Sequence, residues 1–369
     1  MGSQTAAIFL LTSLAGGGSQ RKTIRLTNAL VREGHTVHLC YLDRKEELLS
    51  ALETAPNLHV DCLERDGRFD VGAMRRFARL AAAYPTGTIV AVNPYPVFFA
   101  ANSLGSSRSR YKFVAATNTY TFASSKEAFL FQVFQKRLYR EADLALFGSF
   151  AQKERWCGKY AIDASKAAVI YNGVDLEYYS PDIPLEPFST RANQSAIVIV
   201  FIASLTPHKR HIDLLEAARL VLACGLEVSL VFVGAGPLAG SLEKRARKMN
   251  LHHRVTFVGF VEDVRPYLKA ADIAVLTSNA VETFSNAIVE SMAMGKPVIA
   301  SNIGGAAEQV SHGVNGLLFE PGNVEELASC IMTMCDRDRR LEAGRASRRI
   351  AVERFGLDRM VESYKRILE

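Results

Sequence analysis

Two glutamates on either side of a predicted helix start carry the most informative chemistry of this chain. Glu282 precedes that helix and Glu290 lies just inside it, with Ser285 and Asn286 between them as candidate capping residues. The backbone N–H groups of residues 283–286 are expected to be free at the positive end of the helix, where they attract an anion. Each carboxylate can accept hydrogen bonds from two neighbouring hydroxyls, so the segment suits a ligand with a diol and an anionic group. Glu290 also fits a plainer role, as an acid that stabilises a helix N-terminus.

A second group of polar residues, 204–211, follows a predicted apolar strand at 197–202. Ligands of doubly wound sheets bind at the carboxyl ends of strands, which is where this loop begins. Its adjacent cations, Lys209 and Arg210, would suit a diphosphate, which needs charge neutralisation and several donors. A solvated pair of loop charges is the simpler interpretation of this segment taken alone.

The third candidate is a glycine loop, Gly16, Gly17 and Gly18, between a predicted strand at 7–11 and a predicted helix at 23–32. Glycine lets a ligand approach the backbone closely, and the following helix directs N–H groups at an anion. The loop does not match GxGxxG, so a nicotinamide fingerprint is incomplete. A phosphate or substrate contact and a purely structural turn both remain open.

Short apolar strands that alternate with amphipathic helices must position these residues. In the first half the strands are expected at 7–11, 36–42, 88–92, 112–116 and 144–147. A proline-containing, polar stretch at 181–195 then indicates a linker. The pattern starts again with strands at 197–202, 227–233, 255–258, 273–276 and 297–300. This alternation predicts an α/β protein with two Rossmann-like, doubly wound parallel sheets. A single such domain followed by an unrelated one is the alternative.

The composition excludes a disordered, collagen-like or disulfide-scaffold chain. The chain has 369 residues, 49% hydrophobic and 22% charged, which is ordinary for a globular protein of two domains. No apolar run approaches the ~20 residues that span a bilayer. The six cysteines are scattered, which indicates free thiols in a reducing cytosol. The string Asp336-Arg337-Asp338 matches a divalent-cation motif but is better explained as solvated charges.

Several short motifs follow one another along nearly the whole chain. They are the glycine loop at 16–18, YNGVD at 171–175, the Lys209 loop, VGAGPL at 233–238, Glu282 with Glu290, MGKPVIAS at 294–301 and NGLLF at 315–319. In this order and spacing they resemble the retaining glycosyltransferases of family 4 (group 1), which have the GT-B fold. Each motif is weak alone, and together they identify a superfamily rather than one enzyme.

The resemblance implies two Rossmann-like domains that face a central cleft. An acceptor-binding domain would comprise residues 1–183 with a C-terminal helix at about 352–369. The last helical stretch, 350–368, would cross back onto this domain. A linker would occupy 184–194, and a donor-binding domain 195–351. Such an enzyme moves a sugar from a nucleotide diphosphate sugar, here expected to be a UDP-sugar, to an acceptor hydroxyl with retention. The expected setting is bacterial envelope polysaccharide, lipopolysaccharide or glycolipid synthesis.

The resemblance also implies individual roles. Glu290 would hold the ribose hydroxyls, Glu282 would contact the donor sugar, and Lys209 would neutralise the leaving diphosphate. Glu282 and Lys209 are thus the expected catalytic residues, although Glu282 is not expected to be a nucleophile. The remaining expected donor contacts are Gly17, Ser204, Arg210, Gly234, Phe260, Val261, Thr283, Phe284, Ser285 and Asn286.

Two positions depart from the family pattern. Ser204 stands where relatives usually have an arginine that grips the diphosphate, and Arg210 could compensate only by turning inward. Thr117 or Asn118 stands where relatives often have a histidine that faces the transferred sugar. With Gly16, Gly17 and Gly18 they form the expected acceptor side.

No metal and no cofactor are expected, because Lys209 and helix dipoles would replace the metal ion. Residues 1–185 have 22 Lys/Arg against 17 Asp/Glu, whereas residues 186–369 have 22 against 21. The basic, amphipathic stretches 65–84 and 129–140 would suit an anionic membrane surface and a sugar or lipid-linked acceptor, in the cytoplasm or on the inner membrane. Helices packed on a sheet show the same pattern. Nucleic acid is not an expected partner, and the sequence does not indicate an oligomeric state.

Other functions stay open at this point. The acceptor could be a soluble small molecule. The same fold also serves nucleotide-sugar epimerases and sugar phosphorylases, although their catalytic patterns are not evident here. Ser204 in place of arginine would also suit a weakened, ligand-binding relative.

Overall fold

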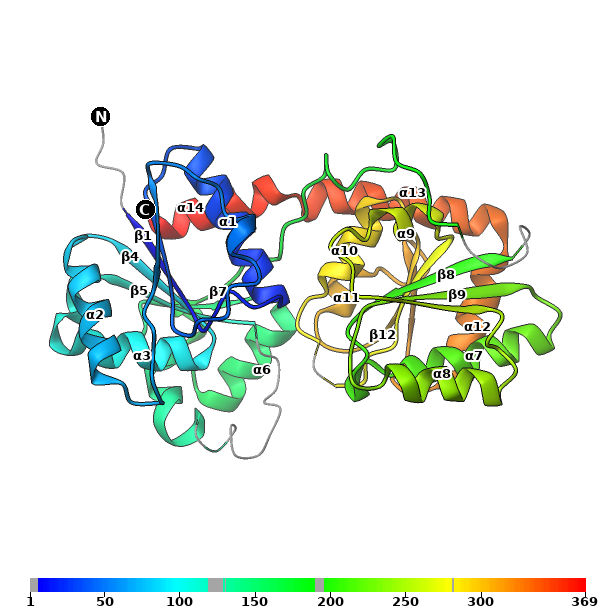
Figure 1. The fold of residues 1–369 in the computed structure, drawn as a ribbon, viewed down its shortest axis with the longest axis horizontal. Helices are drawn as coiled ribbons and strands as arrows, with labels where there is room; N and C mark the ends of the chain where they lie inside the picture. Colours follow the sequence, from blue (N-terminus) through cyan, green and yellow to red (C-terminus); the bar gives the residue numbers. More distant parts are fainter. Residues whose placement is uncertain (1–5, 119–128, 130, 190–195, 281) are drawn as a thin grey trace. The chain divides into compact units, whose positions relative to one another are not determined.

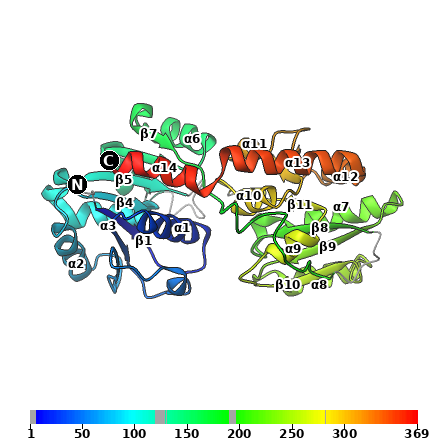
Figure 2. The same ribbon diagram turned by 90° about the horizontal axis from the view of Figure 1, so that it is seen from above.

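The computed structural model describes residues 6–118, 129, 131–189, 196–280 and 282–369. The chain forms two compact units, residues 1–173 with 357–369 (unit 1) and residues 174–356 (unit 2), shown in Figures 1 and 2. Over the described ranges, no helix is both long and apolar enough to cross a bilayer. The six cysteines are free thiols, as expected.

Unit 1 is built on a seven-stranded parallel sheet with the order β3-β2-β1-β4-β5-β6-β7. Its strands are β1 (Ala7–Leu11), β2 (Val37–Tyr41), β3 (Leu58–Cys62), β4 (Thr88–Val92), β5 (Lys112–Thr117), β6 (Leu144–Phe147) and β7 (Ala167–Val169). The β1 sequence AIFLL is buried on both faces: Ile8 and Leu10 join one core, and Phe9 joins the other. That double burial is why this strand reads as a continuous apolar run.

Helices cover both faces of this sheet. They are α1 (Gly18–Arg32), α2 (Val71–Ala82), α3 (Pro94–Leu104), α5 (Lys136–Glu141), α6 (Phe150–Tyr160) and α14 (Leu357–Leu368). Figure 1 shows α1 and α14 on one face and α2 and α3 on the other. The basic stretch 65–84 contributes α2, and the stretch 129–140 contributes a π-helical turn, Phe131–Gln135, and most of α5. Residue 130 lies outside the described residues.

The C-terminal helix α14 belongs to unit 1. Its buried face, which includes Tyr364, packs against Phe9, and the Thr88 hydroxyl donates to the carbonyl of Leu368 at 3.2 Å. The prediction of one helical stretch at 350–368 is wrong, because α13 (Arg337–Arg354) ends before α14 begins. The intervening Phe355 carbonyl accepts a hydrogen bond from the Val174 N–H at 2.8 Å.

Unit 2 is built on a six-stranded parallel sheet with the order β10-β9-β8-β11-β12-β13. Its strands are β8 (Ile197–Ile202), β9 (Val228–Val233), β10 (Val255–Gly259), β11 (Ile273–Leu276), β12 (Val298–Ser301) and β13 (Gly316–Phe319). Its helices are α7 (His211–Ala223), α8 (Ala239–Lys248), α9 (Arg265–Ala270), α10 (Asn286–Ala293), α11 (Ala306–Gln309), α12 (Val324–Cys335) and α13. Two doubly wound sheets confirm the predicted fold class.

The chain passes from unit 1 to unit 2 at residue 174, earlier than the position 183 expected from the sequence. The segment that follows is bonded to unit 2, since the Phe188 N–H donates to the carbonyl of Pro266 at 3.0 Å. Of the predicted linker 184–194, residues 190–194 lie outside the described residues.

Candidate functional site

The candidate donor site lies at the carboxyl edge of the unit 2 sheet. The strand order reverses between β8 and β11, which are neighbours in space but not in sequence. The loop after β8 holds Lys209, and the loop after β11 holds Glu282. Ligands of doubly wound sheets bind at such a switch point, so the fold brings these two predicted catalytic residues to the expected edge.

Lys209 and Glu282 form a buried ion pair. The Lys209 Nζ lies 2.5 Å from the Glu282 Oε2, and the Ser278 hydroxyl donates to the same oxygen at 3.1 Å. The two charged side chains are 16% and 9% exposed. The sequence predicted both residues but not their direct contact.

The loop that carries Lys209 is tied to the end of β11. The Thr277 hydroxyl lies 2.9 Å from the carbonyl oxygens of both Lys209 and Arg210, and the Asn279 N–H donates to the His208 carbonyl at 3.0 Å. These bonds fix the backbone from which the Lys209 side chain projects. Thr277 and Ser278 escaped prediction, although two hydroxyl residues at the carboxyl end of a buried strand are a usable signal.

Arg210 has a structural partner. Its backbone is left-handed, with φ of 53°, where it precedes α7. Its guanidinium donates to Asp213 from Nε at 3.0 Å and from Nη2 at 2.6 Å, and Asp213 is fully buried. The inward turn that would compensate for Ser204 is therefore not seen. Ser204 itself has its hydroxyl 3.3 Å from that of Thr206.

Protonation is disfavoured at His208 and His211, the two histidines near Lys209 in sequence. Burial, together with the nearby Lys209 charge, lowers the pKa of His208 below its ordinary value. The same two causes lower the pKa of His211 to about 3. Neither imidazole can therefore supplement the positive charge of Lys209.

Helix α10 begins as predicted, with Ser285 as its cap. The Ser285 Oγ accepts the Ile288 N–H at 3.4 Å. The expectation that all N–H groups of residues 283–286 are free is wrong for Ser285, whose N–H donates to the Gln309 Oε1 at 3.0 Å. The Gln309 Nε2 in turn donates to the Ser285 carbonyl at 2.8 Å. Gln309 lies 24 residues away, and no local pattern indicates it.

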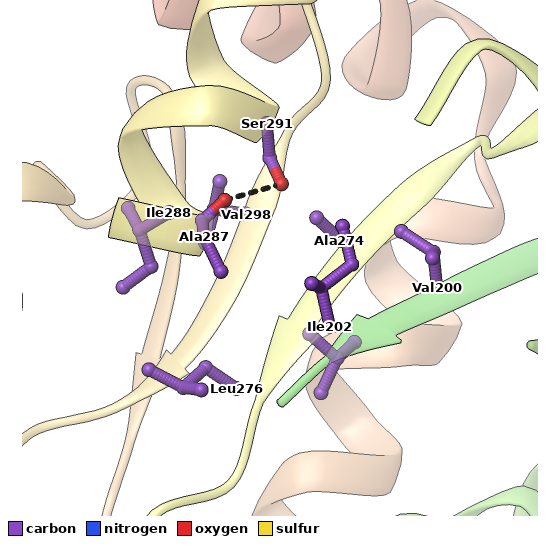
Figure 3. Close-up of a pocket in the computed structure, with 9 residues that line it drawn as sticks. Val200, Ile202, Ala274, Leu276, Ala287, Ile288, Ser291 and Val298 are labelled. Carbon is purple, nitrogen blue, oxygen red and sulfur yellow. Dashed lines mark hydrogen bonds between the residues drawn. The ribbon is translucent and has the colours of Figure 1, made fainter. Parts of the chain in front are cut away.

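Glu290 is buried on α10, one turn beyond the cap. Figure 3 shows how this helix rests on the sheet: Ile288 and Ala287 lie over Val200, Ile202, Ala274, Leu276 and Val298, around a small apolar cavity. The Ser291 hydroxyl donates back to the Ala287 carbonyl at 2.7 Å. This packing sets the position of the helix and therefore that of Glu290. Nearby, the ring of Phe284 packs 5.4 Å from that of Phe355.

Two glycines allow backbone segments of the site to touch. A Cβ at Gly234 would lie 2.1 Å from the Ala203 carbonyl oxygen, and one at Gly304 would lie 1.7 Å from that of Glu282. Gly234 also donates its N–H to the Gly259 carbonyl at 2.8 Å. Phe260, which follows Gly259, is 63% exposed, and Val261 comes next in the sequence.

The expected acceptor residues lie in unit 1. The Gly16 N–H donates to the Glu47 Oε2 at 3.0 Å, Gly17 caps α1, and Gly18 is its first residue. Thr117 ends β5 and is buried, and the Asn118 N–H donates to the Asn93 Oδ1 at 3.0 Å. Their acceptor role and the donor contact expected of Gly17 stay predictions.

The DxD string has a structural explanation. The Asp336 carboxylate accepts the Arg339 N–H at 2.9 Å and caps α13. In the part of the chain that the structure describes, no three His, Cys, Asp or Glu side chains are grouped to hold a metal ion.

Comparison with known proteins agrees with this reading of the fold. A model described as Glycosyltransferase Family 4 matches residues 16–178, and one described as Glycosyl transferases group 1 matches residues 196–337. Crystal structures of Anabaena Alr3699/HepE in complex with UDP and with UDP-glucose superpose with TM-scores of 0.83 and 0.81 at 23% identity. They cover 99% and 98% of this chain, respectively, and 99% of the Anabaena chain in each case.

Curated relatives are similar over part of their length. One is the Escherichia coli UDP-Gal:alpha-D-GlcNAc-diphosphoundecaprenol alpha-1,3-galactosyltransferase, 32% identical over 47% of this chain and 46% of its own. Another is the Bacillus anthracis N-acetyl-alpha-D-glucosaminyl L-malate synthase, 27% identical over 54% of this chain and 52% of its own. The matches thus span about half the length of these relatives. With one family model on each half and the GT-B fold throughout, the chain belongs to the group 1, family 4 glycosyltransferases.

Proposed function

We propose that this chain transfers a sugar from a nucleotide diphosphate sugar, a UDP-sugar, to an acceptor hydroxyl. The observation that carries the proposal is the Lys209–Glu282 pair at the switch point of unit 2, close in sequence to the cap of α10 and to Glu290. Carboxylates accept hydrogen bonds from sugar hydroxyls, and a cation neutralises a diphosphate. Both kinds of group follow neighbouring strands here, and a nucleotide diphosphate sugar has both parts. The Anabaena complexes with UDP and UDP-glucose support the choice of UDP.

In this proposal Lys209 stabilises the leaving diphosphate. Its ammonium has three donors, and the hydrogen bond to Glu282 occupies one of them. Negative charge grows on the diphosphate as the glycosidic bond breaks, so a cation held there stabilises the transition state more than the bound donor. Arg210 is bound to Asp213, and protonation of both neighbouring histidines is disfavoured, so we assign the diphosphate charge to Lys209.

We propose transfer with retention and without a metal ion. We propose that Glu282 binds rather than attacks, since its Oε2 accepts hydrogen bonds from Lys209 and Ser278. A leaving phosphate oxygen would instead take the acceptor proton on the same face of the sugar. Proton NMR of the first product formed would show the donor's anomeric configuration, and activity would survive EDTA. An inverted product contradicts this mechanism.

We also propose that the acceptor is a bacterial envelope glycan or glycolipid precursor, reached in the cytoplasm or at the inner membrane. The name of the E. coli relative supports a lipid-linked acceptor. Unit 1 exposes 68% of Phe69 and 56% of Val71 beside the exposed arginines 68, 75 and 79. Apolar side chains beside cations favour an anionic bilayer surface.

Vesicle sedimentation tests the membrane contact. Phosphatidylglycerol vesicles should retain the wild-type chain, and Phe69→Ser with Val71→Ser should release it. The matched control is Val352→Ser, another exposed apolar residue but in unit 2. The membrane contact would be refuted if the vesicles retained all three proteins equally, or if they did not retain the wild-type chain.

Thermal shift with UDP-, GDP-, ADP- and TDP-sugars tests the function itself, because a ligand that binds the native state raises Tm. A UDP-sugar should stabilise the chain most and should then be hydrolysed or transferred. Stabilisation without any turnover would favour a binding protein, and no stabilisation by any donor would refute the proposal.

A further inference from the structure

Unit 1 contains a buried lysine that the proposed reaction does not use. Lys22, on the second turn of α1, is 7% exposed. Its Nζ makes one long hydrogen bond, 3.5 Å, to the Ile170 carbonyl and lies 5.7 Å from the centre of the Tyr364 ring. Among the described residues no carboxylate pairs with it.

Such a placement is unfavourable for the protein alone. Burial lowers the pKa of Lys22 from 10.5 to about 8, so roughly nine in ten of these side chains are still charged at pH 7. A buried ammonium with one weak acceptor is poorly compensated, and an apolar residue of similar size would be more stable there. The described part of the chain offers this cation no opposite charge, which suits the site to an anionic ligand.

Lys22 lines a cavity at the carboxyl edge of the unit 1 sheet. Thr23, Thr117 and Asn118 add polar atoms to its wall. The apolar part of the wall is Phe9, Val92, Ala116, Leu146, Phe147 and Tyr364. The enclosed space is about 10 Å³, enough for one small polar group such as a ligand oxygen, and the cavity opens to solvent. The lining residues come from α1, α14 and the strands β1, β4, β5 and β6, with Asn118 directly after β5. β1 and β4 form the switch point of this sheet, where ligands of such folds bind.

We propose that this cavity binds an oxyanion, a carboxylate or a phosphate monoester, carried by the sugar acceptor, with the Lys22 ammonium as its charge partner. The identification of the ligand as the sugar acceptor rests on the proposed transfer reaction. The anion site itself does not require turnover. The adjacent glycine loop is a weaker partner for the anion, because the Gly16 N–H is already bonded to the Glu47 carboxylate. Lys22 therefore decides whether an acceptor with a negative charge is accepted.

Carbon-13 NMR of the full chain, labelled at lysine Cε, tests the site directly. Inorganic phosphate and malonate are added separately at constant ionic strength against chloride. Either anion should move the Lys22 signal and raise its pKa by about one unit or more, because an adjacent negative charge favours the ammonium. An unchanged Lys22 pKa with both anions overturns the proposal, and the difference between them identifies the preferred anion.

Lys22→Met and Lys153→Met form a matched pair of variants. Lys153 likewise donates to a backbone carbonyl, that of Ala167 at 2.6 Å, but it does not line the cavity. The anion-induced rise in Tm should vanish in Lys22→Met and persist in Lys153→Met. Equal rises in both variants contradict the site. Should Lys22→Met not fold, the wild-type NMR titration still decides.

A UDP titration of the wild-type chain separates this inference from the proposed function. Anion binding at Lys22 with no UDP binding would support the anion site and contradict the proposed transferase function. UDP binding with no response at Lys22 would support the transferase function and contradict the anion site.

Discussion

Removing one partner of the Lys209–Glu282 pair should destabilise unit 2. At 2.5 Å and an effective dielectric constant of about 20, the gross attraction is about 7 kcal/mol, most of which offsets desolvation. Glu282→Gln strands a largely buried ammonium, so we expect a loss of about 3 kcal/mol in the free energy of unfolding. The double variant with Lys209→Met strands no charge and should lose less than the two single losses combined.

Urea unfolding of the wild type, the two single variants and the double variant measures this double-mutant cycle, and unit 1 serves as the internal control. Far-UV circular dichroism follows the whole chain, whereas the single tryptophan, Trp156, is buried on α6 and reports on unit 1. The lower free energy of unfolding should appear in the transition followed by circular dichroism. The transition followed by tryptophan fluorescence should change little. Additive losses in the double variant, or a loss below about 0.5 kcal/mol in Glu282→Gln, would refute the buried pair.

Three further results are expected. Arg210→Ala should lower the free energy of unfolding by about 3 kcal/mol, because it leaves buried Asp213 unpaired; a large loss of UDP affinity would instead restore Arg210 to the donor site. Ser285→Ala should lower the free energy of unfolding by about 1 kcal/mol, because the helix loses its cap. Chemical denaturation measures this loss, and an unchanged free energy of unfolding would contradict the cap. The unfolded state binds more protons than the folded state between the Lys22 pKa of about 8 and its ordinary 10.5, so stability from Lys22 should rise with pH there, by up to about 3 kcal/mol. Lys22→Met should flatten that rise, and an unchanged slope would show that Lys22 is not buried in solution.

The sequence predicts the parts of this fold that depend on local pattern. Apolar runs such as that of β1 coincide with buried strands, and Ser285 is the helix cap that its position suggests. β3 was missed because its sequence, LHVDC, alternates polar and apolar residues at the sheet edge, and β7 because it has only three residues.

Contacts between distant residues are what the sequence could not supply for the site. Gln309 reaches Ser285 only because β11 and β12 are neighbours. Lys22 looks like an ordinary helix residue until the return of α14 buries it. Each is a consequence of packing rather than of spacing.

Isothermal titration of UDP tests the central claim, that α10 presents Glu290 to a nucleotide. Wild type is compared with Glu290→Ala and with Glu325→Ala, an exposed acid in the first turn of α12 in the same unit. We predict that Glu290→Ala raises the Kd for UDP at least about tenfold, a loss of about 1.4 kcal/mol, while Glu325→Ala leaves it unchanged. The same Kd for UDP in Glu290→Ala and wild type would contradict the account.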